Sequence, residues 1–455
     1  MTLLEPLVRW EPVEQIFSDQ ARVQAMLDFE AALARAEART GVIPVSAADP
    51  IVAQCKAELL DFDELAHAAS NSGNLAIPLV KQLTKRVSDV DPEAAHYVHW
   101  GATSQDVIDT GSALQLRAAL ELVERELSKL ADEIAALVQQ HRSTLTVGRT
   151  WMQQALPTTL GFQMAGWLDA LDRHVVRIRE SRERCIVLQF GGAVGTIAAL
   201  GSKGLSVAEA IGAELKLPVP ALPWHTHRDR LAEIATAVGI CAGTLGKIAR
   251  NISLAAQTEI AEIAERATEG RGGSSTMPHK RNPVTCATVI SAAMRVPGLV
   301  STMLSAMVQE QERGLGGWHA EWETLPEIVS LTAGALHHLT DTVAGLDIHA
   351  EKMRENLNLT RGLIFAEAVQ MALAGKIGKM QAHEVLERAT KRARAEGTHL
   401  RDVLAHESTV IRHLNPDELQ RLFDPVEYLG VAEEFINRAL ANHATFRPNS
   451  ARKDE

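Results

Sequence analysis

Residues 116–137, LRAALELVERELSKLADEIAAL, repeat their apolar side chains in alternating steps of four and three. The repeated positions are Leu116, Leu120, Val123, Leu127, Leu130, Ile134 and Leu137. This spacing is typical of a helix that packs lengthwise in a bundle. A helix of roughly 30 residues is about 45 Å long at a rise of 1.5 Å per residue. The stretch therefore predicts one long member of a helical bundle.

Four further long helices are predicted along the chain. They are expected at 157–188, from 228 to about 266, from 284 to about 312, and from 325 to about 348. Aromatic residues make up only 4% of the 455 residues, and Ala and Leu abound, which favours helix over sheet. We predict an all-α fold with a helical domain at 1–112, a central long-helix bundle at 113–352 and a helical domain at 353–455. Because such a bundle leaves apolar faces uncovered, an oligomer is expected.

Composition excludes several classes of function. The formal net charge is -11, which does not favour a nucleic-acid surface. The four cysteines have no C-x-x-C spacing, so neither a zinc site nor a disulfide framework is expected, and a reducing cytosol fits. The first residues lack a basic segment followed by an apolar one, and no run of about 18 apolar residues occurs. A cytoplasmic protein without a membrane span is predicted.

Residues 271–283, RGGSSTMPHKRNP, differ in character from the helical patterns on either side. Two glycines give the backbone freedom, and two prolines prevent a regular hydrogen-bonded run. The stretch contains two serine hydroxyls, and three cationic or potentially cationic side chains and one amide follow Met277. Such a loop suits the capture of an anion and the transfer of a proton.

Two other polar stretches, 99–110 and 148–159, lie next to predicted long helices. Thr103 and Ser104 in the first, and Thr158 in the second, resemble helix N-cap residues. A helix N-terminus with hydroxyl groups is also a good anion site, so capping and ligand contact are compatible. Both interpretations stay open for Ser104 and Thr158.

Residues 273–283 of this loop resemble the signature of the fumarase/aspartase superfamily. Residues 99–110, and residues 148–153 with 157–161, resemble its other two sequence regions, and the three regions occur in the expected order. The resemblance covers nearly the whole chain. It implies a three-domain helical fold and a homotetramer whose active sites each take one region from three subunits. It also implies elimination or addition beside a carboxylate through an aci-carboxylate carbanion, without a cofactor.

The resemblance assigns roles to individual residues. Ser274 matches the serine that moves the proton, while Lys280 and Asn282 match the residues that hold the carboxylate and stabilise its dianionic form. Thr103 and Ser104 match substrate-binding hydroxyls, and Arg228 matches a motif of the adenylosuccinate lyase branch. The other residues expected to bind substrate are His99, Trp151, Gln153, Thr158, Ser275, Met277 and His279.

Trp151 is the most informative departure from the superfamily. Most of its lyases have Gly-Arg-Thr-His where this chain has Gly-Arg-Thr-Trp, and that histidine helps to protonate the leaving group. An indole cannot supply a proton at neutral pH. A carboxylate leaving group, with a pKa near 4, needs no such acid. The alternative is that Trp151 is a core aromatic residue.

The reverse of an elimination with a carboxylate leaving group is lactonisation. The tryptophan in place of the histidine and the cationic loop at 271–283 together resemble the carboxymuconate cycloisomerase branch of the superfamily. Enzymes of that branch act on a small tricarboxylate in the protocatechuate branch of the β-ketoadipate pathway. Two stretches, 70–74 and 316–319, also depart from adenylosuccinate lyases. An adenylosuccinate-lyase-type enzyme that cleaves a C–N bond remains the first alternative, and a non-catalytic structural protein the second.

Two further motifs have weaker support. His225 and His227 form a possible metal pair, but no nearby carboxylate completes a ligand set, so no metal site is predicted. The glycine-rich run at 191–195 follows a helical pattern in place of a strand, and it therefore fails the context test for a dinucleotide-binding loop.

Overall fold

The computed structural model describes residues 3–266, 272–273, 277 and 279–446. The chain forms two compact units, and each is assembled from three separate segments. Unit 1 contains the residues up to Leu127, His174–Gly246 and Thr288–His338, and unit 2 contains Ser128–Arg173, Lys247–Ala287 and the residues from Leu339 onward. The division into three domains stays a prediction.

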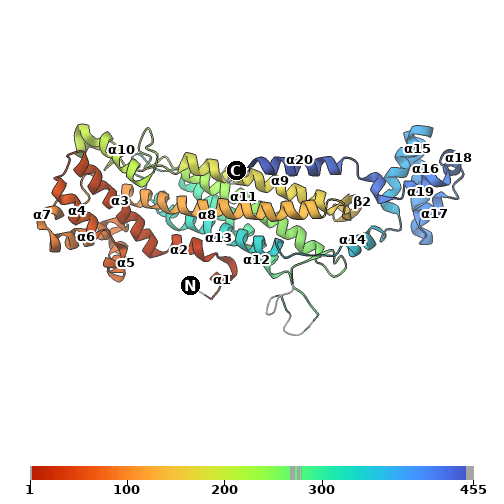
Figure 1. Cartoon of the computed structure of the whole chain (residues 1–455), viewed down its shortest axis with the longest axis horizontal. Coiled ribbons are helices and arrows are strands. Elements are labelled where there is room, and N and C mark those ends of the chain that lie inside the picture. Colours follow the sequence, from red (N-terminus) through yellow and green to blue (C-terminus); the bar gives the residue numbers. More distant parts are fainter. Residues whose placement is uncertain (1–2, 267–271, 274–276, 278, 447–455) are drawn as a thin grey trace, which may run out of the picture. The chain divides into compact units, whose positions relative to one another are not determined.

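Unit 1 begins with short helices, visible in red and orange in Figure 1. They are α1 (Glu5–Val8), α2 (Glu11–Ile16), α3 (Asp19–Arg39), α4 (Val45–Gln54), η1 (Ala57–Leu59), α5 (Phe62–Ser72), α6 (Ala76–Val90) and α7 (Pro92–Ala95). Side-chain caps set several of the starts: Ser18 accepts from Ala21 N before α3, and Asp91 accepts from Glu93 N and Ala94 N before α7. Gly73, in the left-handed conformation, ends α5.

The long helices follow the predicted order with different ends. Their bounds are α8 (Ser104–Gln140), α9 (Leu160–Cys185), α11 (Asp229–Ala255), α12 (Val284–Ala306) and α13 (Gly317–Val343), with η2 (Ala198–Lys203) and α10 (Gly204–Leu215) between α9 and α11. Helix α11 is shorter than predicted, because a turn and strand β3 (Ile263–Ala264) follow it. The all-α prediction is confirmed by this arrangement.

The apolar stripe of α8 lies in the core. Its repeated side chains from Leu116 to Ile134 are at most 2% exposed. Leu137 is only half-buried, and Val138 is 0% exposed in its place. A straight helix has 3.6 residues per turn, so a repeat of 3.5 drifts around its surface and the buried position moves by one residue.

Unit 2 contains a β-hairpin that the sequence did not predict. Strands β1 (Leu145–Thr150) and β2 (Gln153–Thr159) pair antiparallel, with Leu145 opposite Thr159 and Thr150 opposite Gln153. The prediction of a helix from Pro157 is therefore wrong, since Pro157 lies in β2 and α9 begins at Leu160. A second short pair joins β3 to β4 (Asp347–Ile348).

The rest of unit 2 is a cluster of shorter helices. They are α14 (Ala350–Leu357), η3 (Leu363–Phe365), α15 (Ala366–Ile377), α16 (Lys379–Glu396), α17 (Leu400–Leu404), α18 (Ser408–His413), α19 (Pro416–Arg421), η4 (Pro425–Tyr428) and α20 (Ala432–Phe446). Leu373, Val385, Leu400 and Leu404 are at most 2% exposed in the core of this cluster.

Two helices of the described chain, α11 and α12, are long and apolar enough to cross a membrane by length and composition alone. The same test is met by core helices of soluble proteins, so it is weak evidence. They differ in burial, because the most apolar window of α11 is 56% buried and that of α12 only 28%.

Candidate active site

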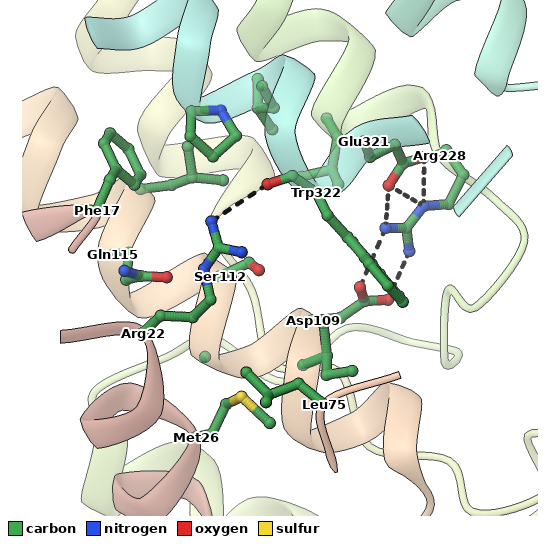
Figure 2. Close-up of a pocket in the computed structure, with 16 residues that line it drawn as sticks. Phe17, Arg22, Met26, Leu75, Asp109, Ser112, Gln115, Arg228, Glu321 and Trp322 are labelled. Atoms are coloured by element: carbon green, nitrogen blue, oxygen red, sulfur yellow. Dashed lines mark hydrogen bonds and ion pairs between the residues drawn. The ribbon is translucent and has the colours of Figure 1, made fainter. Parts of the chain in front are cut away.

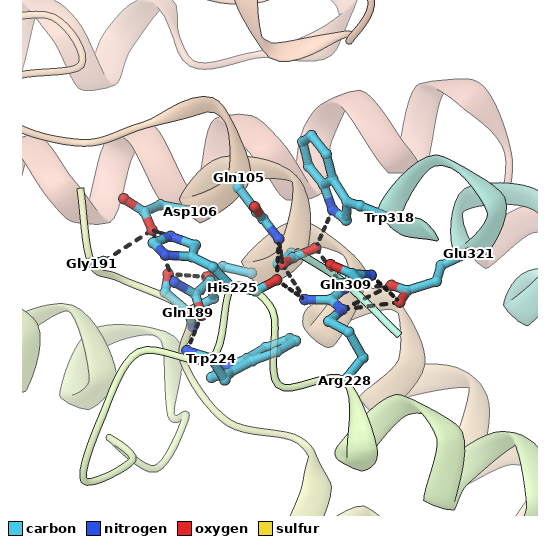
Figure 3. A network of polar contacts seen from close by, with 12 residues as sticks. Gln105, Asp106, Gln189, Gly191, Trp224, His225, Arg228, Gln309, Trp318 and Glu321 are labelled. Atoms are coloured by element: carbon cyan, nitrogen blue, oxygen red, sulfur yellow. Dashed lines mark hydrogen bonds and ion pairs between the residues drawn. The ribbon is translucent and has the colours of Figure 1, made fainter. Parts of the chain in front are cut away.

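Asp106, in the first turn of α8, organises the polar interior of unit 1. Its side chain is 0% exposed and accepts hydrogen bonds from the backbone N–H groups of Thr103, Gly191 and Gly192, all at 2.9–3.0 Å. His225 Nε2 lies 3.0 Å from the same carboxylate (Figure 3). The run at 191–195 therefore binds a carboxylate of its own chain. His225, once considered as half of a metal pair, belongs to this network.

Asp109, one turn further along α8, binds Arg228. The two guanidinium nitrogens Nη1 and Nη2 lie 2.6 and 3.2 Å from its carboxylate oxygens, and Nε lies 3.0 Å from the Glu321 carboxylate (Figure 2). Trp318 Nε1 also donates to Asp109, at 2.9 Å. Arg228 is 2% exposed. Its donors are occupied by buried carboxylates in the described chain, and its role as a substrate ligand stays a prediction.

Thr103 and Ser104 meet an arginine that the sequence analysis missed. Arg313 Nη1 donates to Thr103 Oγ1 at 2.9 Å, and Nη2 donates to Ser104 Oγ at 3.3 Å. The guanidinium lies 5.8 Å from the Trp318 ring centroid. It is half-buried and forms no ion pair with any residue that the structure describes. A cation in this setting can receive a carboxylate from outside the chain.

His99 precedes these hydroxyls in the same turn. Its Nδ1 lies 2.6 Å from Oε1 of Glu30 on α3, and its side chain is 19% exposed. Burial lowers the pKa of His99, but the charge and hydrogen bond of Glu30 and the charge of Asp106 outweigh burial and raise it above its usual value. His99 therefore adds an imidazole with a raised pKa next to Thr103 and Ser104 in sequence.

The two stretches that depart from adenylosuccinate lyases also meet within unit 1. His319 Nε2 donates to the carbonyl oxygen of Gly73 at 3.1 Å, and the His319 and Trp322 rings lie 4.5 Å apart. Beside them is a mostly apolar cavity of about 70 Å³ (Figure 2). Arg228 is the one predicted site residue that lines it, so the cavity lies beneath the network and not at the predicted site.

The described part of the 271–283 loop belongs to unit 2. Lys280, His279 and Met277 are exposed, and Asn282 is half-buried. Asn282 N donates to Gly272 O at 2.9 Å, which closes the base of the loop; a Cβ at Gly272 would come 2.9 Å from Asn282 O. Ser274 and Ser275 lie outside the described residues, so their predicted roles remain predictions.

Two side chains anchor the base of this loop. Arg281 donates to Glu265 O and to Asp347 Oδ2, both at 2.7 Å. The Glu265 carboxylate accepts from Thr285 N and Cys286 N at the start of α12, at 3.2 and 2.8 Å. Carboxylates stabilise helix N-termini in this position. Arg281 thus holds the loop, while Lys280 remains exposed.

Trp151 occupies the tip of the β1–β2 hairpin. It is 98% exposed and its neighbour Met152 is 70% exposed, so the alternative of a core aromatic residue is wrong. Both have positive φ, 52° and 63°, as a two-residue turn of type I′ requires. Asn and Gly normally occupy such positions, because longer side chains are strained there. The hairpin therefore places two strained apolar side chains in solvent.

The hairpin base is firmly held. Arg149 makes two hydrogen bonds to the Glu262 carboxylate, at 2.9 and 2.6 Å. Thr158 is half-buried opposite Thr146 and lines an open groove of about 970 Å³. The capping role considered for Thr158 belongs to Thr159, whose Oγ1 accepts from Phe162 N at 3.1 Å. Gln153 is exposed beside the tip.

Each unit, taken by itself, presents groups that can bind an anion. Unit 1 brings together Thr103, Ser104 and Arg313, with His99 in the same turn. Unit 2 presents exposed Lys280 and His279 on one loop and Trp151 on the hairpin. Hydroxyl donors with fixed cations bind carboxylates and stabilise negative charge as it develops.

Comparison with known proteins identifies the same superfamily as these motifs do. Residues 8–298 match the model of the lyase family, and residues 362–439 match that of the adenylosuccinate lyase C-terminus. A 3-carboxy-cis,cis-muconate cycloisomerase of Pseudomonas aeruginosa is 55% identical over 97% of this chain and 96% of its own length. A nitrosuccinate lyase of Streptomyces davaonensis is 41% identical over 96% of this chain and 94% of its own.

A solved structure supports the same relationship. The 3-carboxy-cis,cis-muconate lactonizing enzyme from Pseudomonas putida superposes with a TM-score of 0.93 at 52% identity, covering 98% of this chain and 99% of the other. The chain belongs to the lyase family, that is, to the fumarase/aspartase superfamily, and is similar over nearly its whole length to 3-carboxy-cis,cis-muconate cycloisomerases.

Proposed function

We propose that this protein is a cycloisomerase that converts 3-carboxy-cis,cis-muconate to carboxymuconolactone in protocatechuate catabolism. The observation that carries this proposal is Trp151, which stands at the position of the general-acid histidine and is 98% exposed at the hairpin tip. A reaction whose leaving group is a carboxylate needs no acid there. Relatives at 50–55% identity with this activity support the same substrate.

The proposed reaction is an intramolecular addition. One carboxylate oxygen of the substrate bonds to a carbon of the conjugated system, and the electron pair of that double bond moves to the carbon beside another carboxylate. That carboxylate takes up the charge as its aci form. A proton then adds to the carbon, so that product and substrate are isomers and no redox partner is required.

Different residues of this chain are proposed to deliver the proton and to bind the carboxylates. Ser274 is proposed to deliver the proton, while Lys280 and Asn282 hold the aci-carboxylate, whose double negative charge a cation and amide donor stabilise. Thr103, Ser104 and Arg313 are proposed to bind another carboxylate, as the geometry of their hydrogen bonds favours. Arg228 keeps this surface in place from beneath, through Asp109 and Glu321.

The remaining predicted ligands flank these groups. His99 is proposed to bind a carboxylate, and Gln153, Thr158, Ser275, Met277 and His279 are proposed to line the substrate site together with Trp151. The hairpin and the 271–283 loop would reach that site from other subunits of a homotetramer. Support for the oligomer comes from α12, whose most apolar window is only 28% buried and whose Met294 is 75% exposed. A cytoplasmic location fits the four free cysteines.

The test is spectrophotometric. Purified protein is mixed with 3-carboxy-cis,cis-muconate, and the ultraviolet absorbance of the conjugated diene is followed. We expect the absorbance to fall as the lactone forms. Unchanged absorbance, together with cleavage of adenylosuccinate, would favour the C–N lyase alternative and overturn the proposal.

Ser274→Ala tests the proposed role of Ser274 in proton transfer. The rate should fall by orders of magnitude with an unchanged melting temperature, since only a hydroxyl is removed. Turnover close to that of the parent protein would remove Ser274 from proton transfer. Trp151→His tests the link between this position and specificity, and lactonisation at the parent rate in that variant would break the link.

A further inference from the structure

Glu30 on α3 is a buried carboxylate with one hydrogen-bond partner among the described residues. It is 1% exposed, its Oε1 lies 2.6 Å from His99 Nδ1, and its Oε2 is buried without a hydrogen-bond partner in the described chain. A buried carboxylate is costly unless a positive charge or several donors compensate it. Here the one donor is the imidazole, which compensates best when it carries a proton on both nitrogens.

The backbone fixes the imidazole against this carboxylate. His99 has a φ of 58°, in the left-handed region that a side chain rarely adopts. Two residues later Gly101 has a φ of 73°, and a Cβ there would come 2.6 Å from Leu200 Cδ2. The turn is therefore held tightly before α8 begins, and the strain at His99 is of the kind that occurs at functional positions.

One further carboxylate, Asp106, favours the proton on His99. Asp106 on α8 adds to Glu30 in favouring a proton on His99, and burial opposes both. Arg313, which is a cation, contacts Thr103 and Ser104, the hydroxyl pair that follows His99 in sequence. The turn thus carries its own negative counter-charges beneath it.

We propose that Glu30 is a positioning residue that holds His99 as an imidazolium, anchored at Nδ1, so that its exposed edge binds a carboxylate of the substrate. This rests on the proposed function, which places His99 at the substrate. Glu30 itself touches no substrate, since it is buried beneath the ring. The pair thereby adds a fixed positive charge for a polyanionic substrate without exposing a negative one.

Glu37 provides a matched control on the same helix. It lies two turns further along α3, is 0% exposed, and neither of its carboxylate oxygens has a hydrogen-bond partner in the described chain. Burial, with a smaller contribution from the charge of Glu30, raises the pKa of Glu37 to about 9. Glu37 is therefore neutral near pH 7, and Glu37→Gln replaces it with a group of the same shape and charge.

The experiment compares Glu30→Gln with Glu37→Gln in the full-length protein. Hydrogen–deuterium exchange at histidine Cε1, read by mass spectrometry on the peptide that contains His99, gives the titration of that ring. Initial rates with 3-carboxy-cis,cis-muconate between pH 6 and 9 give kcat and KM. Glu30→Asp, which keeps the charge on a shorter side chain, serves if Glu30→Gln does not fold.

We expect Glu30→Gln to move the His99 titration to lower pH and to raise KM about tenfold or more at pH 8, with a smaller change in kcat. Glu30→Asp should restore part of the loss, and Glu37→Gln should change neither measurement. An unchanged His99 titration in Glu30→Gln overturns the proposal. A moved titration with an unchanged KM also overturns it, because His99 would then not bind substrate. Failure of the proposed function is distinguishable, since the unmodified protein would then leave the diene absorbance unchanged.

Discussion

The turn that leads into α8 and the tip of the β1–β2 hairpin both carry predicted substrate ligands, but their surroundings are opposite. The turn rests on Asp106 and Asp109, which are 0% and 3% exposed and accept hydrogen bonds from several parts of unit 1. At the tip, Trp151 is 98% exposed in a backbone conformation that favours Asn or Gly. One region is stabilised within its own unit, and the other is not.

The two regions differ in which contacts offset the cost of their strained backbone conformations. A side chain at positive φ costs about 1 kcal/mol or more. At the turn, buried ion pairs and hydrogen bonds offset that cost. At the tip, exposed Trp151 and Met152 recover little of it from their own chain. We infer that the tip is completed by another copy of the protein, as the proposed homotetramer requires.

The largest expected effect is on the buried ion pairs under the turn. Arg228→Met leaves Asp109 and Glu321 buried without their cation. Breaking such a pair costs about 3–5 kcal/mol, so the melting temperature should fall markedly. Arg230→Met, two residues along and half-buried, is the control and should cost under about 1 kcal/mol. Equal melting temperatures for the two variants would contradict the structural role of Arg228.

Arg313→Ala should act on catalysis more than on stability. The arginine makes no ion pair with described residues but contacts both hydroxyls, so its loss should lower kcat/KM by about 10²–10³-fold. Arg313→Lys keeps the charge without the planar fork and should recover only part of this. The measurement is steady-state kinetics together with a melting curve. A parent-like kcat/KM in Arg313→Ala would show that the turn lacks this ligand.

The buried carboxyl group of Glu37 should make the free energy of unfolding depend on pH. Its pKa is about 9 in the folded protein, above the ordinary value near 4.3, so the folded state binds the extra proton. The stability that this proton provides is complete below pH 4 and is lost as pH rises toward 9. Glu37→Gln should therefore raise the free energy of unfolding by about 1–3 kcal/mol at pH 8 and flatten its pH dependence.

Denaturant unfolding at pH 5, 6.5 and 8 measures this effect. At pH 5 the variant and the parent protein should unfold at similar denaturant concentrations, because pH 5 is close to the ordinary pKa of a glutamate and ionisation of Glu37 in the unfolded chain then favours unfolding only slightly. If the two curves stayed parallel at every pH, the carboxyl group of Glu37 would have to be ionised at neutral pH.

The smallest change in stability is expected at the tip. Replacing Trp151 with Asn and Met152 with Gly relieves both positive φ angles and should stabilise the chain by about 0.5–1 kcal/mol. Lactonisation should nevertheless fall, since the indole is lost from the proposed site. Melting curves and diene absorbance give the two measurements. A lower melting temperature would mean that contacts of Trp151 and Met152, within the chain or with another copy, stabilise the protein by more than their positive φ angles cost.

The regular parts of this fold could be predicted from the sequence. The four–three spacing of apolar residues identified α8, and the residues at that spacing are buried up to Ile134. The loop at 271–283 and its neighbours identified the superfamily, because each motif is continuous in sequence. Local patterns of this kind need no knowledge of what lies across the bundle.

Features that depend on distant contacts could not be predicted. Arg313 lies 210 residues from Thr103, so no spacing joins them. Arg228 matched a motif, but only the fold shows that Asp109 and Glu321 occupy its donors. The hairpin was not predicted because its two turn positions hold Trp151 and Met152. The usual sequence signal for such a turn is Asn-Gly.

A subunit-mixing experiment tests most directly whether the two regions act together across copies of the chain. Arg313→Ala, which damages the turn, and the double variant with Asn at 151 and Gly at 152, which damages the tip, are mixed, dissociated and reassembled. Turnover of 3-carboxy-cis,cis-muconate is then measured. If sites are shared between subunits, some mixed sites receive an intact turn and an intact tip, and the mixture should be clearly more active than either variant treated alone. A mixture whose activity equals the average of the two variants would contradict this account.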